Sequence, residues 1–312
     1  MGKYQTFLQK FPEVKKDTLL SPLTTYKVGG KADLFLATAN EKLIKDASEL
    51  AARMKIKTFF LGGGSNVVFS DRGFRGLIVK LIAKPTVVKS TKIIVSAGSP
   101  LEEVVKTAAQ NSLSGLEWAA GIPGTLGGAV YGNAGAWGQD IAKTFVEATI
   151  LTPSGKIQRW KNKDFCFSYR SSRLKKIKGK HIILSVVLKL ASGNQKKIKQ
   201  EMEENIKNRG HLPIEPSAGC IFKNIIATEK IAKKIPNEAI KHGKIPVGWL
   251  IESLGLKGKK IGGAIISPEH ANFIINTGKA RASDIKKLKD LIKKKVKERF
   301  GIILEEEVEF VE

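Results

Sequence analysis

The sequence predicts an α+β fold in which strand-rich early segments are followed by a more helical last third. In the early part, short apolar runs with the period of a strand alternate with amphipathic helices. The helical period recurs later, in residues 196–208 and 284–300. Glycine-dense loops lie between the early part and these two segments. No internal repeat or long low-complexity linker interrupts this order.

The first third contains three predicted strands and one helix. Residues 33–39 and 76–81 read as strands, and residues 57–61 form a short apolar strand that runs directly into a run of glycines. Asn40 is a predicted N-cap, because asparagine side chains accept hydrogen bonds from the first free amides of a helix. The apolar residues that follow it, from Leu43 to Met54, recur at the helical period.

The middle of the chain is predicted to be mainly extended. Strands are expected at residues 92–97, 145–151, 156–160 and 181–190, with a type I turn at Thr152–Gly155. Ser99 followed by Pro100 predicts a helix start, with serine as the N-cap and proline at the first helical position.

The last third ends in a long helix and an acidic segment. Ser283 is the predicted N-cap of the final helix, and Gly301 is the expected stop, because glycine readily takes the left-handed conformation that ends helices. Residues 302–311 are predicted to form an acidic strand.

Composition restricts the class of protein. The chain has 312 residues, 42% of them hydrophobic, and no apolar run long enough to cross a membrane. Its two cysteines, Cys166 and Cys220, do not form a disulfide framework, so a reducing compartment is expected, with Cys166 buried as a small apolar residue. The polar first ten residues argue against secretion.

The net charge of +25 has two interpretations. A nucleic-acid-binding protein is one, because clustered cations bind phosphates. Here the lysines are spread along the whole chain with few aromatics among them, which favours solvated helix surfaces. A basic surface would also attract a polyanionic cofactor or substrate.

Two glycine-rich loops carry the first chemical signal. Residues 62–66 read Gly-Gly-Gly-Ser-Asn directly after a strand, and residues 121–135 contain a second cluster. Glycine lets the backbone approach a ligand closely, and successive amides can form an anion-binding nest. Neither loop is a standard dinucleotide or ATP motif, so tight turns are the alternative. The pair of loops, with polar side chains in both, favours a dinucleotide whose pyrophosphate is bound by both loops. The expected contacts are Gly62, Gly63, Gly64, Ser65, Asn66, Gly121, Ile122, Pro123, Gly124, Thr125, Gly128 and Asn133.

Six ordered motifs then resemble one family. The first loop, continued by residues 67–69, resembles the phosphate-binding loop of FAD domains of the vanillyl-alcohol-oxidase type, and the second resembles the other FAD loop of the UDP-N-acetylenolpyruvoylglucosamine reductase (MurB) family. The segments that match this family specifically are Thr24–Asp33, Ser168–Ser172, Ser217–Asn224, Gly248–Glu252 with residues 257–258 and 261–264, and Leu304–Val308. The short chain between the second and third of these resembles the shorter type of the family, which lacks an extra tyrosine loop.

The resemblance implies a division into three parts. Residues 1–82 and 83–194 would form a two-part FAD-binding region of the vanillyl-alcohol-oxidase/MurB type, and residues 195–312 a substrate-binding α+β domain with a C-terminal catalytic strand. Noncovalent FAD is implied, since neither glycine loop contains the histidine or cysteine to which related oxidases attach their flavin. NADPH is implied as the hydride donor, and no metal is expected.

The implied reaction reduces an enolpyruvyl ether of a nucleotide sugar to UDP-N-acetylmuramate, for peptidoglycan synthesis. Arg170, by resemblance, stabilises negative charge on the substrate carboxylate, and Cys220 takes the place of the usual serine proton donor. The family's C-terminal motif usually reads Leu-Glu-Pro-Glu-Val-Arg, whereas this chain has Glu306 for the proline and Glu309 for the arginine. Both Glu305 and Glu307 then fit the functional carboxylate, and position favours Glu307.

Five further residues resemble substrate-contacting positions: Tyr169, His211, Lys223, Asn224 and His270. A lone histidine is more often structural, which is the alternative for both histidines. The remaining alternatives for the whole chain are another noncovalent-FAD oxidoreductase of the same cofactor fold and, in a different class, the basic nucleic-acid-binding protein. The resemblance implies a cytoplasmic monomer that binds neither nucleic acid nor membrane.

Overall fold

The computed structural model describes residues 2–177 and 181–312. The chain divides into two compact units, which are described separately. The first unit comprises Met1–Thr18, Ala32–Gly64 and Arg75–Arg209, and the second Leu19–Lys31, Ser65–Phe74 and Gly210–Glu312. The predicted division into two FAD-binding parts and a substrate-binding domain, with boundaries near residues 82 and 194, stays a prediction.

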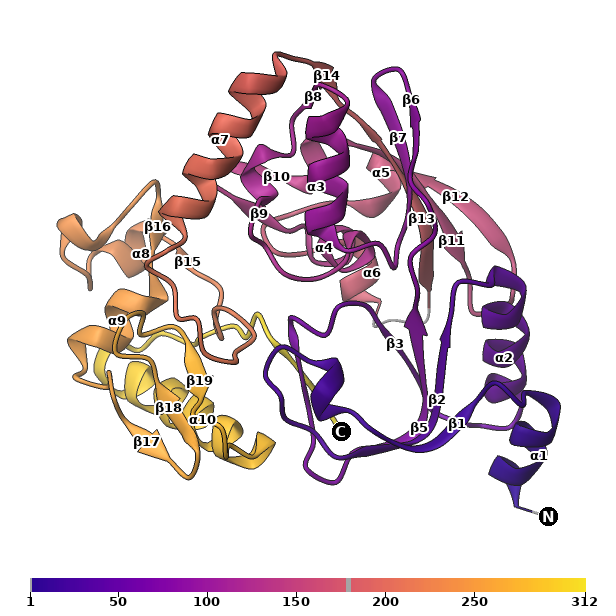
Figure 1. Ribbon diagram of the computed structural model, residues 1–312. Helices are drawn as coiled ribbons and strands as arrows, with labels where there is room; N and C mark the ends of the chain where they lie inside the picture. The colour runs from indigo at the N-terminus through magenta and orange to yellow at the C-terminus, as the bar shows by residue number, and fades with distance from the viewer. Residues whose placement is uncertain (1, 178–180) are drawn as a thin grey trace. The chain divides into compact units, whose positions relative to one another are not determined.

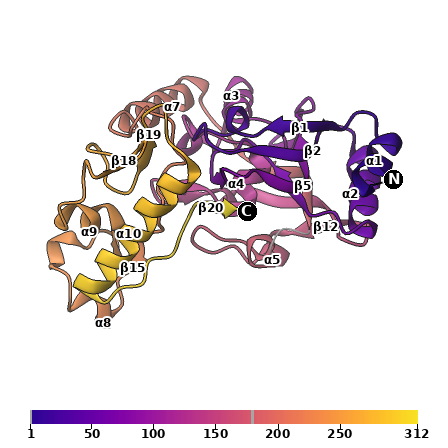
Figure 2. The same cartoon turned by 90° about the horizontal axis from the view of Figure 1, so that it is seen from below.

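A four-stranded sheet forms one half of the first unit (Figure 1). Its strand order is β1 (Lys15–Leu19), β2 (Lys31–Thr38), β5 (Phe74–Leu81) and β3 (Thr58–Leu61). Helices α1 (Lys3–Lys10) and α2 (Glu41–Arg53) share one hydrophobic core with β2 and β5, and Figure 2 shows both helices at this end of the unit. The strands predicted at residues 33–39, 57–61 and 76–81 are confirmed, whereas α1 and β1 were not predicted.

A five-stranded antiparallel sheet forms the other half. Its order is β12 (Ile157–Lys161), β11 (Phe145–Leu151), β13 (Ile182–Lys189), β7 (Lys92–Ser96) and β6 (Val87–Lys89). Helices α3 (Leu101–Gln110) and α4 (Leu126–Gly132) pack with this sheet around a second core. The remaining elements of the first unit are β8 (Leu113–Ser114), η2 (Glu117–Ala119), β9 (Gly135–Ala136), β10 (Gln139–Asp140), η3 (Ile141–Lys143), α5 (Asn162–Phe165), α6 (Arg173–Lys176), β14 (Ala191–Ser192) and α7 (Gln195–Asn208).

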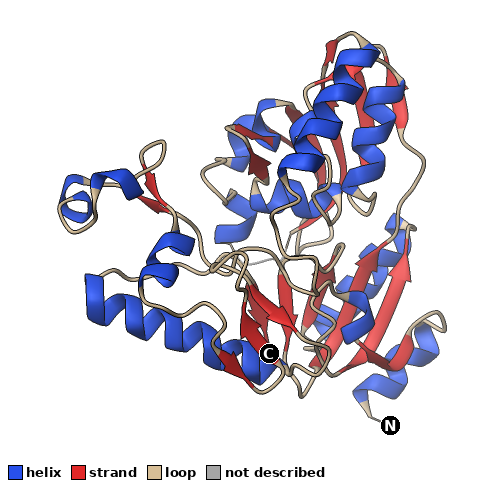
Figure 3. Cartoon of the chain, turned by 60° about the vertical axis from the view of Figure 1, so that its left-hand side comes forward, coloured by secondary structure: helices blue, strands red, loops and turns tan. Residues whose placement is uncertain are grey.

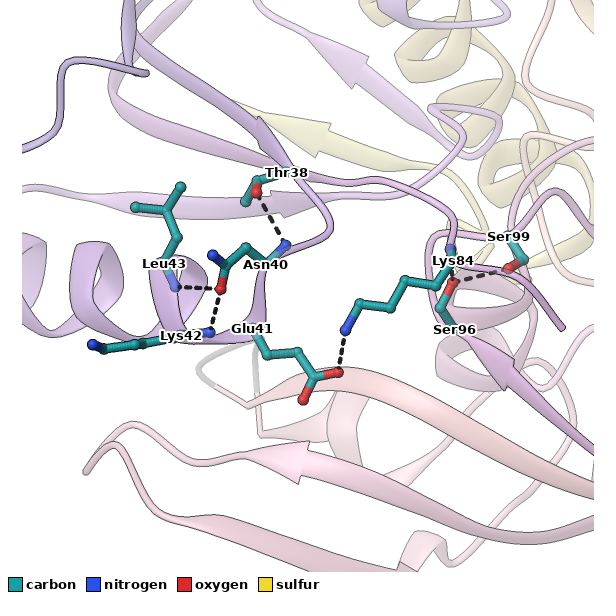
Figure 4. A network of polar contacts seen from close by, with 8 residues as sticks. All are labelled: Thr38, Asn40, Glu41, Lys42, Leu43, Lys84, Ser96 and Ser99. Carbon is teal, nitrogen blue, oxygen red and sulfur yellow. Dashed lines mark hydrogen bonds and ion pairs between the residues drawn. The ribbon is translucent and has the colours of Figure 1, made fainter. Parts of the chain in front are cut away.

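Figure 4 shows the polar contacts where the two halves of the first unit join. Asn40 caps α2 as predicted, its Oδ1 accepting from the amides of Lys42 and Leu43. Lys84 pairs with Glu41 at 2.7 Å, and its backbone N–H donates to Ser96 Oγ at 2.9 Å.

The prediction of Ser99 as the N-cap of α3 is wrong. The Ser99 hydroxyl instead lies 2.9 Å from that of Ser96. The N-cap is Pro100, without a side-chain cap bond, and the Leu101 amide donates to Gly124 O in the second glycine loop. The start of α3 is therefore satisfied by the loop's backbone.

The second unit is built around the longest helix of the described chain, α10 (Ala282–Phe300), which stands out in Figure 3. It shares a core with α9 (Val247–Ser253) and with the antiparallel sheet β17 (Lys260–Ile261), β18 (Ala264–Ile266) and β19 (Ile274–Asn276). Its other elements are η1 (Ser21–Leu23), β4 (Val67–Phe69), β15 (Ile225–Ile226), α8 (Glu229–Ala232), η4 (Asn237–Ala239), β16 (Lys244–Ile245) and β20 (Glu309–Val311).

Two early segments of the chain, Leu19–Lys31 and Ser65–Phe74, belong to this unit, and the first of them is bonded to its core. Tyr26 is fully buried, and its hydroxyl donates to Ile274 O at 2.6 Å, while Asn276 Nδ2 donates to Tyr26 O at 2.9 Å. Thr25 Oγ1 donates to Ser217 O at 2.6 Å. The motif Thr24–Asp33 thus begins as part of the core of the second unit.

The cap of α10 differs from the prediction of Ser283. The N-cap is Arg281, and Ser283 lies inside the first turn. The Asp71 carboxylate accepts from the amides of Ala282 (2.7 Å) and Ser283 (3.1 Å), so a distant side chain satisfies the helix start. Gly301 ends the helix in the left-handed conformation, as predicted.

The predicted acidic strand over residues 302–311 is mostly wrong. Only β20 forms, pairing in parallel with β4 in the register Glu309 to Val67. Residues before it make an isolated bridge, Phe222 with Glu306, rather than a continuous ladder. Across the described residues, no helix combines the length and apolarity that a membrane crossing requires.

Candidate active site

The two glycine loops contact each other within the first unit. A Cβ built on Gly62 would lie 2.5 Å from Thr125 Oγ1, and one on Gly63 would lie 2.6 Å from Gly124 Cα. These distances are shorter than real Cβ contacts, so both positions require glycine for the loops to meet. From the sequence, we predicted that these glycines let a ligand approach the backbone. The structure shows that they also let one loop approach the other.

The loops fit a bound pyrophosphate by their shape and composition. Gly64, Gly121 and Gly124 have positive φ angles of 66°, 74° and 122°, respectively. Gly121 and Gly128 are exposed, and Thr125 caps α4, its Oγ1 accepting from the Gly128 amide at 3.4 Å. Neither loop contains an acidic side chain that would repel a phosphate.

The side chains of the two loop asparagines bind protein backbone. Asn66 Nδ2 donates to Glu307 O at 3.0 Å in the second unit. Asn133 Nδ2 donates to Ser168 O at 3.0 Å in the first. Each amide therefore holds a segment that carries a candidate catalytic residue.

Arg170 lies in a tight two-residue turn. Ser168 and Ser171 exchange backbone hydrogen bonds of 3.0 Å in both directions, and Arg170 has a φ of +53°. Its guanidinium carbon lies 5.6 Å from the centre of the Tyr169 ring, in cation–π contact. The turn thus brings two of the predicted residues together, both half-buried.

Cys220 lies in an extended segment held from two sides within the second unit. On one side Cys220 bridges to Phe273, and the Ile221 amide donates to Asn272 O at 2.8 Å. On the other side the Glu307 amide donates to Ile221 O at 2.8 Å. Cys220 is half-buried, and Gly219 before it has a φ of +74° with open space where a Cβ would stand.

Asn272 anchors this segment and was missed by the sequence analysis. Its side chain is 1% exposed and makes two bonds with one residue, accepting from Phe222 N at 3.1 Å and donating to Phe222 O at 2.8 Å. An asparagine inside the apolar run of residues 271–275 was the available signal, because a buried amide needs partners.

The three consecutive glutamates have different surroundings. Glu305 is 72% exposed and its carboxylate pairs with Lys223. Glu306 accepts from Lys293 at 2.8 Å and pairs with Lys289 at 3.0 Å. Burial opposes its ionisation, but these two cations outweigh it and lower the pKa of Glu306. Glu307 is half-buried, with its backbone bonded on both sides.

Four other predicted residues also lie in the second unit. Lys223 is 11% exposed at its side chain and pairs with Glu305, and Asn224 Oδ1 accepts from the amide of Val247 at the start of α9. The rings of His211 and His270 lie 6.5 Å apart. Burial is the main cause that lowers the pKa of His270 below its usual value, and the neighbouring His211 adds to it.

Cys166 corrects an expectation. It was predicted to be buried, but it is exposed at the C-cap of α5 with a φ of +44°, and its Sγ donates to Lys163 O. Among the described residues, no group of three or more His, Cys, Asp and Glu side chains is placed to hold a metal ion.

Comparison with known proteins defines first the class. The model of an FAD-binding domain family matches residues 32–161, and the model of the UDP-N-acetylenolpyruvoylglucosamine reductase C-terminal domain matches residues 211–311. The chain is therefore an FAD-dependent oxidoreductase by class.

The particular family follows from full-length relatives. The chain is 37% identical over 99% of its length to UDP-N-acetylenolpyruvoylglucosamine reductase 2 of Bacillus cereus, covering 96% of that protein. It is 36% identical to the reductase of Halalkalibacterium halodurans over 96% of this chain and 94% of the relative. The crystal structure of the Thermus caldophilus enzyme matches with a TM-score of 0.76 and 32% identity, over 94% of this chain and 97% of that one. The chain belongs to the UDP-N-acetylenolpyruvoylglucosamine reductase family.

Proposed function

We propose that the protein reduces UDP-N-acetylglucosamine enolpyruvate to UDP-N-acetylmuramate with NADPH as the hydride donor, in peptidoglycan precursor synthesis. The observation that carries the proposal is the direct contact of the two glycine loops, because it fits a dinucleotide cofactor in a chain that belongs to this reductase family.

Noncovalent FAD is the cofactor that the loops would hold. When bound, FAD would supply hydride transfer from NADPH to the terminal carbon of the enolpyruvyl group. The backbones of residues 62–64 and 121–124 would bind its pyrophosphate, with Ser65, Thr125 and Gly128 close to them in sequence. Ile122 and Pro123 would supply apolar contact. Asn66 and Asn133 would act through the backbone, since their side-chain amides bind Glu307 and Ser168.

Arg170 would stabilise the charge that builds on the substrate carboxylate after hydride addition. A guanidinium presents a planar fork of donors that matches a carboxylate. Hydrogen-bond donors that are already in position where negative charge develops are the usual source of transition-state stabilisation. The fixed Ser168–Ser171 turn supports this role, because it holds the arginine backbone in one conformation.

Cys220 would protonate the carbon that bears the carboxylate. An unperturbed thiol has a pKa of about 8.5, so it carries its proton at neutral pH and releases it readily. Cys220 is half-buried, and a Cβ at the preceding Gly219 would meet open space. Glu307 is the carboxylate we assign to catalysis, because Glu305 is exposed and engaged by Lys223.

The substrate contacts would come from Tyr169, His211, Lys223, Asn224 and His270. Lys223 would supply a positive charge for a diphosphate. Burial lowers the pKa of His270, which favours a hydrogen bond from its neutral ring over an ion pair. We further propose that the protein works as a cytoplasmic monomer without nucleic acid, its basic charge serving solubility and the attraction of anions.

Purification and spectroscopy test this proposal. The protein is expected to be yellow, to release FAD on denaturation, and to sustain multiple turnovers of NADPH only when UDP-N-acetylglucosamine enolpyruvate is present. A colourless folded protein that also fails to bind added FAD would contradict it. Salt-sensitive DNA binding by that colourless protein would favour the nucleic-acid alternative instead.

A further inference from the structure

We propose that Asn133 and Ser172 are positioning residues for Arg170. They fix its turn to the C-terminal end of α4, the helix that starts at the second glycine loop. The inference rests on the proposed catalytic function of Arg170 and deepens it.

Asn133 is buried, and its side chain binds the entrance of the arginine turn. It is 4% exposed and caps α4 with a φ of +47°, a conformation that asparagine tolerates better than most residues. Its Nδ2 donates to Ser168 O at 3.0 Å, and to Asp140 Oδ2 at 3.4 Å. Its Oδ1 accepts from the Ala142 amide at 3.3 Å. One of these bonds, to Ser168 O, holds the entrance of the arginine turn, and the other two hold the amide itself in place against residues 140 and 142.

Ser172 fixes the exit of the same turn. It is fully buried, and its hydroxyl donates to Tyr131 O at 2.7 Å, in the last turn of α4. The same oxygen accepts from the Lys175 amide and so caps α6. The two anchors therefore hold both sides of Arg170 to the last residues of one short helix.

Arg170 needs such support because of its backbone. A φ of +53° is unfavourable for a residue with a long side chain, and such conformations persist only where the surroundings enforce them. The two serine–serine backbone bonds close the turn but do not fix its place in the unit. The bonds from α4 do, so their loss should displace the guanidinium while the glycine loop stays in place.

The test uses the complete flavoprotein and measures the two half-reactions separately. Asn133→Gly removes the amide but keeps a residue that accepts a left-handed backbone, so it avoids added strain. Because glycine keeps the backbone through which this position would contact FAD, we expect nearly parental flavin content and flavin reduction by NADPH. Reoxidation by substrate should be slowed by between about ten- and a hundredfold. Ser172→Ala should do the same, and Ser172→Thr, which retains the hydroxyl, should recover most of the rate.

Asn194→Gly serves as the matched control. Asn194 also caps a helix of the first unit, α7, and it makes no bond to the arginine turn. It should lower thermal stability without changing reoxidation. A change in reoxidation equal to that of Asn133→Gly would show that any lost cap has this effect, and would overturn the proposal.

A double-variant comparison distinguishes positioning from an independent role. If Asn133 acts through Arg170, Asn133→Gly should add little to the defect of Arg170→Ala. Multiplication of the two defects, or parental reoxidation in folded Asn133→Gly protein, would refute the positioning role. Parental reoxidation in Arg170→Ala would instead refute the arginine's catalytic role, and a parent protein that substrate cannot reoxidise would refute the proposed function itself.

Discussion

Replacing Asn272 by leucine should destabilise the segment that carries Cys220. Leucine branches at Cγ as asparagine does, but it is bulkier and has no polar atoms, so the change creates no empty space. It leaves both the N–H and the C=O of Phe222 without the bonds of 3.1 and 2.8 Å that the amide makes. Phe222 is fully buried, so water cannot easily replace the lost partner.

The expected magnitude follows from those two groups. A buried backbone group left without a partner costs about 1–3 kcal/mol, so the pair should cost about 2–6 kcal/mol. For a protein of this size that corresponds to a fall in melting temperature of at least several degrees. Substrate-dependent reoxidation should slow as well, since Cys220 precedes Phe222 by two residues.

The assay is a thermal melt of the flavoprotein, followed by near-UV circular dichroism, with a matched control. Asn237→Leu makes the same chemical change at an exposed position of the second unit and should leave the melting temperature within about 1 °C. If Asn272→Leu melts as the parent does, the two bonds do not hold the Cys220 segment and our description of that segment is wrong.

Four further predictions concern the loops, the catalytic residues and a helix cap. Gly63→Val should abolish FAD binding because its side chain would collide with Gly124, and a folded variant with parental FAD content, measured by fluorescence after denaturation, would contradict the loop assignment. Arg170→Ala should leave flavin reduction intact and slow reoxidation by roughly 10²–10³ in stopped flow, and equal slowing of both halves would count against it. Cys220→Ser should keep substantial turnover while Cys220→Ala loses product formation, so an alanine variant at the parental rate would exclude the thiol as the essential donor. Asp71→Asn should lower the melting temperature at neutral pH and lose its effect in acid.

The sign of the Asp71 effect follows from its surroundings. Burial opposes ionisation of Asp71, but hydrogen bonds from Ser283 and Ala282 and the charge of Arg281 outweigh it, so its pKa in the folded protein is lowered. Its stabilisation is therefore present above the unfolded pKa of about 3.9 and is lost as pH falls through the folded pKa. Melting temperatures of parent and Asp71→Asn should converge over that range, and a constant difference would contradict the ionised cap.

Local patterns predicted the elements that local forces decide. The Asn40 cap and the stop at Gly301 depend on neighbours in sequence, and the strands at residues 33–39 and 145–151 could be recognised from the pattern of their own residues. The structure confirms all four. Ser283 fits the local pattern of a cap equally well, but Asp71, more than two hundred residues earlier, satisfies the helix start. Such a partner cannot be found from the local sequence.

The candidate site was predictable as residue types but not as a set of contacts. Family motifs pointed to Arg170, Cys220 and Glu307. Nothing local indicated that Asn133 would bind beside Arg170, or Asn66 beside Glu307, because both bonds join distant parts of the chain. Asn272 resembled an ordinary strand residue until its bonds to Phe222 were seen.

The proposed reaction is tested most directly by one anaerobic turnover. The purified flavoprotein is reduced with one equivalent of NADPH and then mixed in D₂O with UDP-N-acetylglucosamine enolpyruvate, while flavin absorbance is followed and the product is examined by mass spectrometry and NMR. We predict full reoxidation and one UDP-N-acetylmuramate per flavin, with deuterium at the carbon that bears the carboxylate. Flavin that stays reduced in the presence of this substrate, with the substrate recovered unchanged, would contradict the proposed function.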